Sequence, residues 1–395
     1  MDAPSSGDRD TVVVPADHGG SSLACIRSLG RAGYDVLGVA SSSTAPPLSS
    51  KHCGEARVAP SPGTDLDGYR DVLLEVAGRP DVLTVVPMYE PDVYVLARDR
   101  ELFAERVTTP WPGFEAVRLA QDRLRLVDLA EAAGVATPET ALLSEWDAWD
   151  ERSVIKPRYG VVVDDGAATY PGVEVREPGD PPDVDRIVER MGHEPVVQAY
   201  VPGDDEHGFF ALYDEGRAVA KFQHRRVRSY TYAGGASVYR EAIDRPRLEA
   251  AGTTVLDALD WNGPAMVEFR RDERDGAYRL IEVNPRFWGS LPLAVEAGVD
   301  FPALYADVAT GDVTRPVYEF DTDVGCHVLR GEASYLHSLL RYDYDHVEQP
   351  SVARSLAAVV GSICRQPNFD YLSLRDGSPF VRDLLNTVGE ASRGE

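Results

Sequence analysis

The chain has 395 residues, of which 43% are hydrophobic, and this length exceeds what one ordinary hydrophobic core accommodates. Its net charge of −25, from 65 acidic and 40 basic residues, argues against nucleic acid as a partner, because the phosphate backbone would be repelled. There is no run of about 18 apolar residues that could span a bilayer, and the polar N-terminus, MDAPSSGDRD, lacks the pattern of a signal peptide. We therefore expect a cytoplasmic protein of two or three domains with no membrane partner.

Nearly all of the 40 basic residues are arginine, and only Lys51, Lys156 and Lys221 are lysine. An acidic surface poor in lysine resembles that of proteins from salt-loving organisms. High salt would screen the repulsion among so many like charges. The composition therefore predicts a halophilic source.

Residues 1–112 are predicted to form a Rossmann-like α/β domain. TVVVP reads as a buried strand, and Leu23, Ile26 and Leu29 recur at helical spacing before Gly33 ends the helix. A second strand, a further helix and the strand VLTVVPM follow, which favours a small parallel sheet. The DHGGSS turn lacks the GxGxxG spacing of nicotinamide nucleotide sites, so we expect it to contribute substrate contacts instead.

The remainder alternates between helix and strand without an internal repeat. The prolines of TPWPG (109–113) mark a domain boundary. A first α+β lobe is predicted over 113–200 and a second over 201–312, the latter containing hairpins at 207–226 and 263–287. A mainly helical extension is predicted over 313–395.

The second hairpin carries acids whose relative position depends on its register. If Arg271 pairs with Ala277 across a five-residue loop, Glu268 and Glu282 lie diagonally on one face. If Asp275-Gly276 forms a tight two-residue turn, the two acids point to opposite faces. The DG pair by itself slightly favours the tight turn.

The charges favour the other register. Glu268, Glu282 and Asn284 repel one another or are costly to bury in an apolar hairpin unless a cation binds them. Hard oxygen ligands of this kind suit Mg²⁺, with Mn²⁺ as a substitute. These three residues are therefore predicted to form a metal site, the alternative being that each faces solvent on an exposed sheet.

Lys156 ends a predicted strand, RSVIKP, just before a loop with several glycines. A lysine there can reach a phosphate while the amides of the loop close over a nucleotide. Because nearly every other basic residue is arginine, a retained lysine indicates a specific need for an ammonium group. The same reasoning extends to Lys221.

With these motifs, residues 10–312 resemble the ATP-grasp enzymes, whose members include D-alanine:D-alanine ligase and biotin carboxylase. The resemblance implies that ATP lies between the two lobes. It implies phosphate contacts from Arg123, which follows an aspartate, and from Lys156. It also implies that the strand VQAYVPG (197–203) lines the adenine through Gln198, Tyr200 and Val201.

The resemblance further implies that Glu268, Glu282 and Asn284 ligate Mg²⁺ and that Arg286 faces the transferring phosphoryl group. Two features depart from the family pattern. The loop over the phosphates, GVVVDDG, is bulkier and more acidic than usual. The acid that usually binds ribose is replaced by Ala199, so Asp204, Asp205 or Glu206 just beyond it is the expected substitute.

The activity implied by the resemblance is an ATP-dependent carboxylate-amine ligase that forms an amide through an acyl phosphate. Small-molecule acids and amines would be its partners, with Arg226 and Arg228 as cations for an anionic substrate. Two alternatives stay open, namely a small-molecule kinase and a non-catalytic nucleotide-binding regulator. A homodimer would be ordinary for such a protein.

Overall fold

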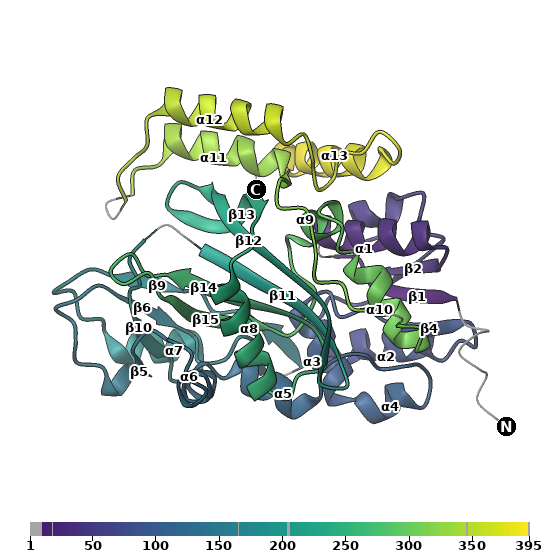
Figure 1. The fold of residues 1–395 in the computed structure, drawn as a ribbon, viewed down its shortest axis with the longest axis horizontal. Coiled ribbons are helices and arrows are strands. Elements are labelled where there is room, and N and C mark those ends of the chain that lie inside the picture. The colour runs from purple at the N-terminus through teal and green to yellow at the C-terminus, as the bar shows by residue number, and fades with distance from the viewer. Residues whose placement is uncertain are drawn as a thin grey trace.

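The computed structural model describes residues 10–17, 19–164, 166–203, 206–313, 315–344 and 347–393. A small parallel sheet, a four-stranded antiparallel sheet and a long six-stranded sheet lie in sequence order, and three helices lie across one end (Figure 1). Within these ranges, none of the helices has both the length and the apolar character needed to cross a bilayer. The fold class predicted from the sequence, α/β followed by α+β with a helical extension, is confirmed.

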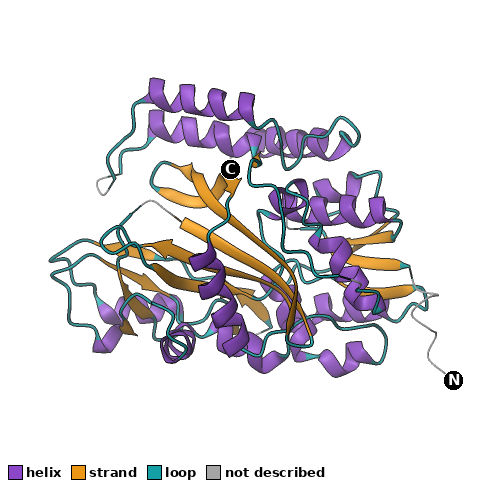
Figure 2. Cartoon of the chain, in the orientation of Figure 1, coloured by secondary structure: helices purple, strands orange, loops and turns teal. Residues whose placement is uncertain are grey.

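The N-terminal sheet has the order β3-β2-β1-β4, with all neighbouring strands parallel. The two strands β1 and β4 are buried apolar runs because helices cover both faces (Figure 2). The exposed edge strand, EARV, was not predicted because it has no apolar pattern. The elements are β1 (Thr11–Pro15), α1 (Gly19–Ala32), β2 (Asp35–Ala40), η2 (Pro46–Ser49), β3 (Glu55–Val58), α2 (Leu66–Ala77), β4 (Val82–Val85), α3 (Glu90–Arg98) and α4 (Arg100–Ala104).

The next segment forms a sheet of order β5-β10-β6-β9 and a separate hairpin, β7-β8. Its two opening helices meet at Asp122, whose extended backbone interrupts them and whose carboxylate accepts two hydrogen bonds from Arg158 at 3.0 and 2.9 Å. The elements are α5 (Phe114–Gln121), α6 (Arg123–Ala132), β5 (Thr140–Leu142), η3 (Leu143–Glu145), β6 (Ser153–Lys156), β7 (Val162–Asp164), β8 (Ala167–Thr169), β9 (Glu174–Arg176), α7 (Val184–Met191) and β10 (Val196–Ala199).

The large sheet has the order β15-β14-β11-β12-β13-β16. The predicted turn at 214–216 is confirmed, with Glu215 and Gly216 both at positive φ, as a tight hairpin turn requires. Phe210, Phe222 and Trp288 belong to the core cluster that joins this sheet to the N-terminal domain. The elements are β11 (Glu206–Asp214), β12 (Arg217–Thr231), β13 (Gly234–Ala242), α8 (Pro246–Ala258), β14 (Gly263–Arg271), β15 (Tyr278–Asn284), α9 (Leu291–Glu296) and α10 (Phe301–Thr310).

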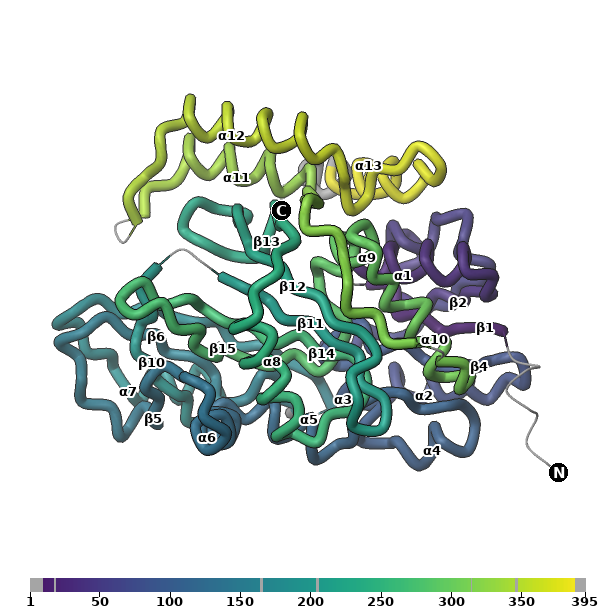
Figure 3. Tube along the Cα trace, viewed as in Figure 1, coloured from purple at the N-terminus to yellow at the C-terminus, as the bar shows by residue number. Residues whose placement is uncertain are grey.

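The C-terminal extension consists of β16 (Gly325–His327), α11 (Leu329–Arg341), α12 (Val352–Arg365) and α13 (Ser378–Arg393). The strand β16, which was not predicted, pairs with β13 and ties the extension to the large sheet. A buried ion pair of 2.9 Å between Arg240 on β13 and Asp370 adds a second attachment. The helices cross above β12 and β13 and reach the N-terminal domain (Figure 3).

Candidate active site

A β-bulge in the β14–β15 hairpin sets the position of the acids. Arg271 pairs with Tyr278, and the register shifts between Glu268 and Phe269, so that Glu268 lies directly opposite Glu282. The predicted tight turn at Asp275-Gly276 is therefore wrong. The alternative, a five-residue loop, is one residue shorter than the loop that the structure has. Because the bulge adds one residue to β15, both carboxylates point to the same face of the sheet.

The pKa values of the two carboxylates are shifted in opposite directions. Burial, followed by the neighbouring Glu282 carboxylate, raises the pKa of Glu268 to about 7. Burial also raises the pKa of Glu282, but Arg123 and Lys156 outweigh it and leave this pKa below its ordinary value. The Asn284 amide donates to Glu282 at 3.1 Å and to Glu268 at 3.3 Å, so the three side chains converge on one point.

The side-chain oxygens of Glu268, Glu282 and Asn284 are suitable ligands for a hard divalent cation. A bound cation would replace the amide as the group that offsets the negative charge, and the Asn284 oxygen would then face it. Among the described residues there is no group of three or more His, Cys, Asp or Glu placed to hold a metal. The site at Glu268 and Glu282 therefore depends on the Asn284 amide oxygen as its third protein donor.

Two cations flank the acids. Arg123 at the start of α6 donates to Glu282 at 3.0 Å and to the Pro157 carbonyl at 2.7 Å. The Lys156 ammonium at the end of β6 has no hydrogen bond or ion pair within the described residues. Burial, and secondarily Arg123, lowers the pKa of Lys156 to about 8. An unpaired, desolvated ammonium of this kind is suited to receive an anion.

A cavity of about 700 Å³ runs from Lys156 across the large sheet to the N-terminal domain. Gln198, Tyr200 and Val201 line one end together with apolar side chains of β6, β9 and β15. The Gln198 amide nitrogen donates to Thr140 at 3.1 Å, whereas its buried Oε1 has no partner in the described part of the chain. This end can therefore hold a flat apolar ring that carries a hydrogen-bond donor. Asp204, predicted to bind ribose, lies outside the described residues.

Arg286 lies where the large sheet meets the N-terminal domain. Its Nε donates to Glu90 Oε1 at 2.6 Å, and one of its Nη atoms donates to Asn284 at 3.3 Å. Glu90 begins α3 just beyond β4, at the carboxyl end of the parallel sheet. Sequence reasoning missed this residue, although ligand sites at that edge of parallel sheets are the rule.

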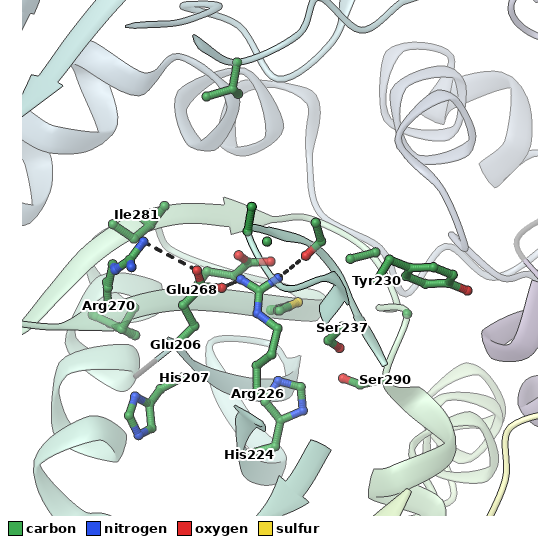
Figure 4. A pocket seen from close by; sticks show the side chains of 18 of the residues that line it. Glu206, His207, His224, Arg226, Tyr230, Ser237, Glu268, Arg270, Ile281 and Ser290 are labelled. Carbon is green, nitrogen blue, oxygen red and sulfur yellow. Dashed lines mark hydrogen bonds and ion pairs between the residues drawn. The ribbon is translucent and has the colours of Figure 1, made fainter. Parts of the chain in front are cut away.

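The structure places the other predicted cations in different surroundings. Arg226 lines the cavity and pairs with Glu206, and Figure 4 shows it beside Glu268. Arg270 also borders the cavity, and its guanidinium lies 5.1 Å from the centre of the Tyr200 ring. Tyr230 and Ser290 lie toward the opposite end, so the cavity has cations near its middle and hydroxyl groups beyond them.

Two predicted ligands are not in the site. Arg228 is buried in an ion pair with Glu332 on α11 at 2.8 Å and does not line the cavity. Lys221 pairs with Glu249 on α8 at 3.0 Å and lies over the Tyr318 ring. A basic residue on a strand can neutralise an acid on a covering helix, and the sequence does not show which helix covers it.

The GVVVDDG segment forms the β7–β8 hairpin, whose residue 165 lies outside the described ranges. Gly166 accepts a hydrogen bond from Leu66 at 2.8 Å, and Ala168 donates to Pro62 at 3.1 Å. Tyr170, just after the hairpin, lies 5.4 Å from Tyr89 between ring centres. This hairpin is thus held by the N-terminal domain.

Residues 194–331 match a family model described as "ATP-grasp in the biosynthetic pathway with Ter operon". This range includes β14, β15 and the facing acids. This part of the chain is therefore similar to the ATP-grasp family. A curated relative, the carbamoyl phosphate synthase large chain of Methanoculleus marisnigri, is 28% identical over an alignment of 218 residues that covers 50% of this chain and 20% of that protein. The chain thus matches only a fifth of the length of that relative.

Solved structures share the ATP-grasp fold over most of the chain. The biotin carboxylase domain of Hydrogenobacter thermophilus 2-oxoglutarate carboxylase, solved with MgADP and bicarbonate, has a TM-score of 0.62 at 18% identity and covers 80% of this chain and 73% of its own. N5-carboxyaminoimidazole synthetase from Staphylococcus aureus has a TM-score of 0.62 at 15% identity, with 82% of each chain covered. These likenesses establish the fold.

Proposed function

We propose that this protein is an ATP-dependent ligase that joins a small-molecule carboxylate to an amine and releases ADP and phosphate. The facing pair Glu268 and Glu282, with Asn284 between them and the unpaired Lys156 beside them, carries the proposal. A site that only bound a nucleotide would not need two half-buried carboxylates that repel each other. The printed names of the relatives above, which include ligase-type enzymes, support the same reaction class.

The nucleotide would occupy the end of the cavity at β10. Its adenine would lie among the apolar residues, where the exocyclic amine can donate to the orphaned Gln198 Oε1, and Tyr200 and Val201 would border the ring. Lys156 and Arg123 would then face the phosphates, since both lie toward the acids. We extend this assignment to Asp204 as the ribose ligand.

Glu268, Glu282 and Asn284 would hold Mg²⁺, or Mn²⁺ in its place, which when bound neutralises charge on the phosphates. A substrate carboxylate oxygen would attack the γ-phosphorus while the bond to the ADP oxygen breaks, giving an acyl phosphate and ADP. Arg286, held by Glu90, would lie beside the transferred group and stabilise its charge. Arg226 would offset the charge of the acid.

In the second step, the amine nitrogen would attack the acyl carbon. The carbon–oxygen bond to phosphate breaks, the amine proton passes to solvent, and an amide and phosphate are released. Because ATP and Mg²⁺ are cytoplasmic metabolites, we place the reaction in the cytoplasm. The halophilic source, the domain boundaries and a homodimer stay predictions.

The reaction can be tested with purified protein, MgATP and a small-molecule extract in high salt, with Glu282→Ala as the inactive control. Mass spectrometry would follow ADP, phosphate and new products. A condensation product with phosphate release, absent from the control, supports the ligase. A product heavier by one phosphoryl group would show a kinase instead, and bound ATP without turnover would favour a regulator.

A further inference from the structure

A second cavity of about 300 Å³ lies between α11, α13 and the segment that connects α12 to α13. It shares Val328, Arg330 and Tyr371 with the large cavity, so the two cavities adjoin at these side chains. The connecting segment also closes onto the N-terminal domain, since a Cβ on Gly19 would lie 2.5 Å from the Tyr371 hydroxyl. The C-terminal extension therefore forms part of the wall of the reaction cavity.

The lining of the second cavity is mainly apolar. It includes Leu329, Ala333, Phe369, Leu372, Phe380 and Leu384. Leu372 and Leu384, which both line it, are 37% and 55% exposed, so the protein leaves these apolar side chains partly uncovered. Burying such surface under an apolar ligand is favourable.

Arg330 stands at the junction of the two cavities, and its charge is already balanced. Its guanidinium donates to Thr387 at 3.1 Å and lies 3.5 Å from Asp383 on α13. A ligand that passes this point therefore does not need to bring a second negative charge into the apolar cavity.

We propose that the acid substrate carries an apolar group, aliphatic or aromatic, that occupies the cavity between α11 and α13 while its carboxylate reaches Arg286. This inference rests on the proposed ligase function. Arg286, Ser290, Gly19 and Tyr371 all line the large cavity, so this cavity extends from Arg286 to the side chains that it shares with the second cavity. The substrate is the acid because its carboxylate must lie by the phosphates while its other end is free to extend.

Binding tests the cavity independently of turnover. Calorimetry would measure butyrate, hexanoate, octanoate and 4-phenylbutyrate on the full chain with MgADP. Affinity should rise up to about fourfold per buried methylene. Ala333→Phe, which fills the cavity from α11, should abolish this gain, whereas Ala358→Phe on the exposed face of α12 should not. Equal affinity along the series, or equal effects of the two variants, would overturn the proposal.

A second pair of variants distinguishes a loss of ligand binding in the cavity from a loss of folding. Leu384→Asp places a charge in the cavity, and Leu385→Asp places one on the same helix outside its lining, at positions 55% and 59% exposed. Only Leu384→Asp should weaken octanoate binding, by at least about tenfold, and identical losses in both variants would count against the cavity.

Turnover separates the two proposals. Hydroxylamine can replace the unknown amine, because it converts an acyl phosphate to a hydroxamate and phosphate. If the ligase proposal holds, the longer acids give hydroxamate, and Ala333→Phe raises their KM at least about tenfold while the KM for ATP is unchanged. If octanoate binds in the cavity but no acid gives hydroxamate, the ligase proposal is contradicted and the cavity proposal is supported. If short acids react as well as long ones, the cavity proposal is contradicted and the ligase proposal is supported.

Discussion

Replacing Glu268 by glutamine should stabilise the metal-free protein at alkaline pH and abolish its stabilisation by Mg²⁺. The glutamine keeps the shape of the side chain but removes the negative charge opposite Glu282. In the wild type, this charge must either bind a proton or meet a cation. The variant therefore removes the repulsion and the metal ligand together.

The size of the effect follows from the pKa of Glu268, which is about 7 in the folded protein against an ordinary 4.5. The folded state holds this proton more tightly than the unfolded state, so the proton's contribution to stability is present at low pH. It is lost as pH rises through about 7. Between about pH 5.5 and pH 8.5 the wild type should lose about 2 kcal/mol that the variant retains.

The measurement is thermal unfolding by circular dichroism at the two pH values, at one constant salt concentration, with and without Mg²⁺. Constant salt is needed because screening alters the effects of the surface charges. Glu273→Gln in the exposed turn between β14 and β15 removes the same charge outside the site and serves as the control. Mg²⁺ should raise the unfolding temperature of the wild type and of the control, but not that of Glu268→Gln.

Parallel pH dependence of unfolding in Glu268→Gln and the wild type would show that Glu268 does not hold a proton against Glu282. Equal Mg²⁺ stabilisation of the two proteins would show that the metal binds elsewhere. Either result would refute the reasoning that links the β-bulge to a metal site.

Three further predictions follow from side-chain contacts. Lys156→Ala should weaken ATP binding by at least about tenfold in a calorimetric titration, whereas Lys221→Ala should leave it unchanged because that ammonium pairs with Glu249 outside the cavity. Glu90→Gln should lower kcat by about tenfold with little change in the KM for ATP, because it weakens the contact that positions Arg286 at the transferred group. A change in the KM for ATP alone would contradict this positioning role. Asp370→Asn should destabilise the protein by about 3–5 kcal/mol in thermal unfolding, because it leaves a buried arginine of β13 without its partner.

Local sequence patterns predicted the order of helices and strands well. The apolar runs of β1 and β4 and the turn at 214–216 follow from burial and turn chemistry, which depend on neighbouring residues. The types and spacing of Lys156, Glu282 and Asn284 are the local features from which a phosphate and metal site is predicted. These properties are local, so the sequence by itself determined them.

Pairing across the chain was decided only by the tertiary structure. Side chains alternate between the two faces of a strand, so one bulged residue in β15 determines whether Glu268 and Glu282 meet. The same holds for contacts between distant segments. Glu90 reaches Arg286 across 196 positions, and Arg228 is bound to Glu332 on a helix of the extension. Such contacts depend on how whole elements pack, and no local pattern records that packing.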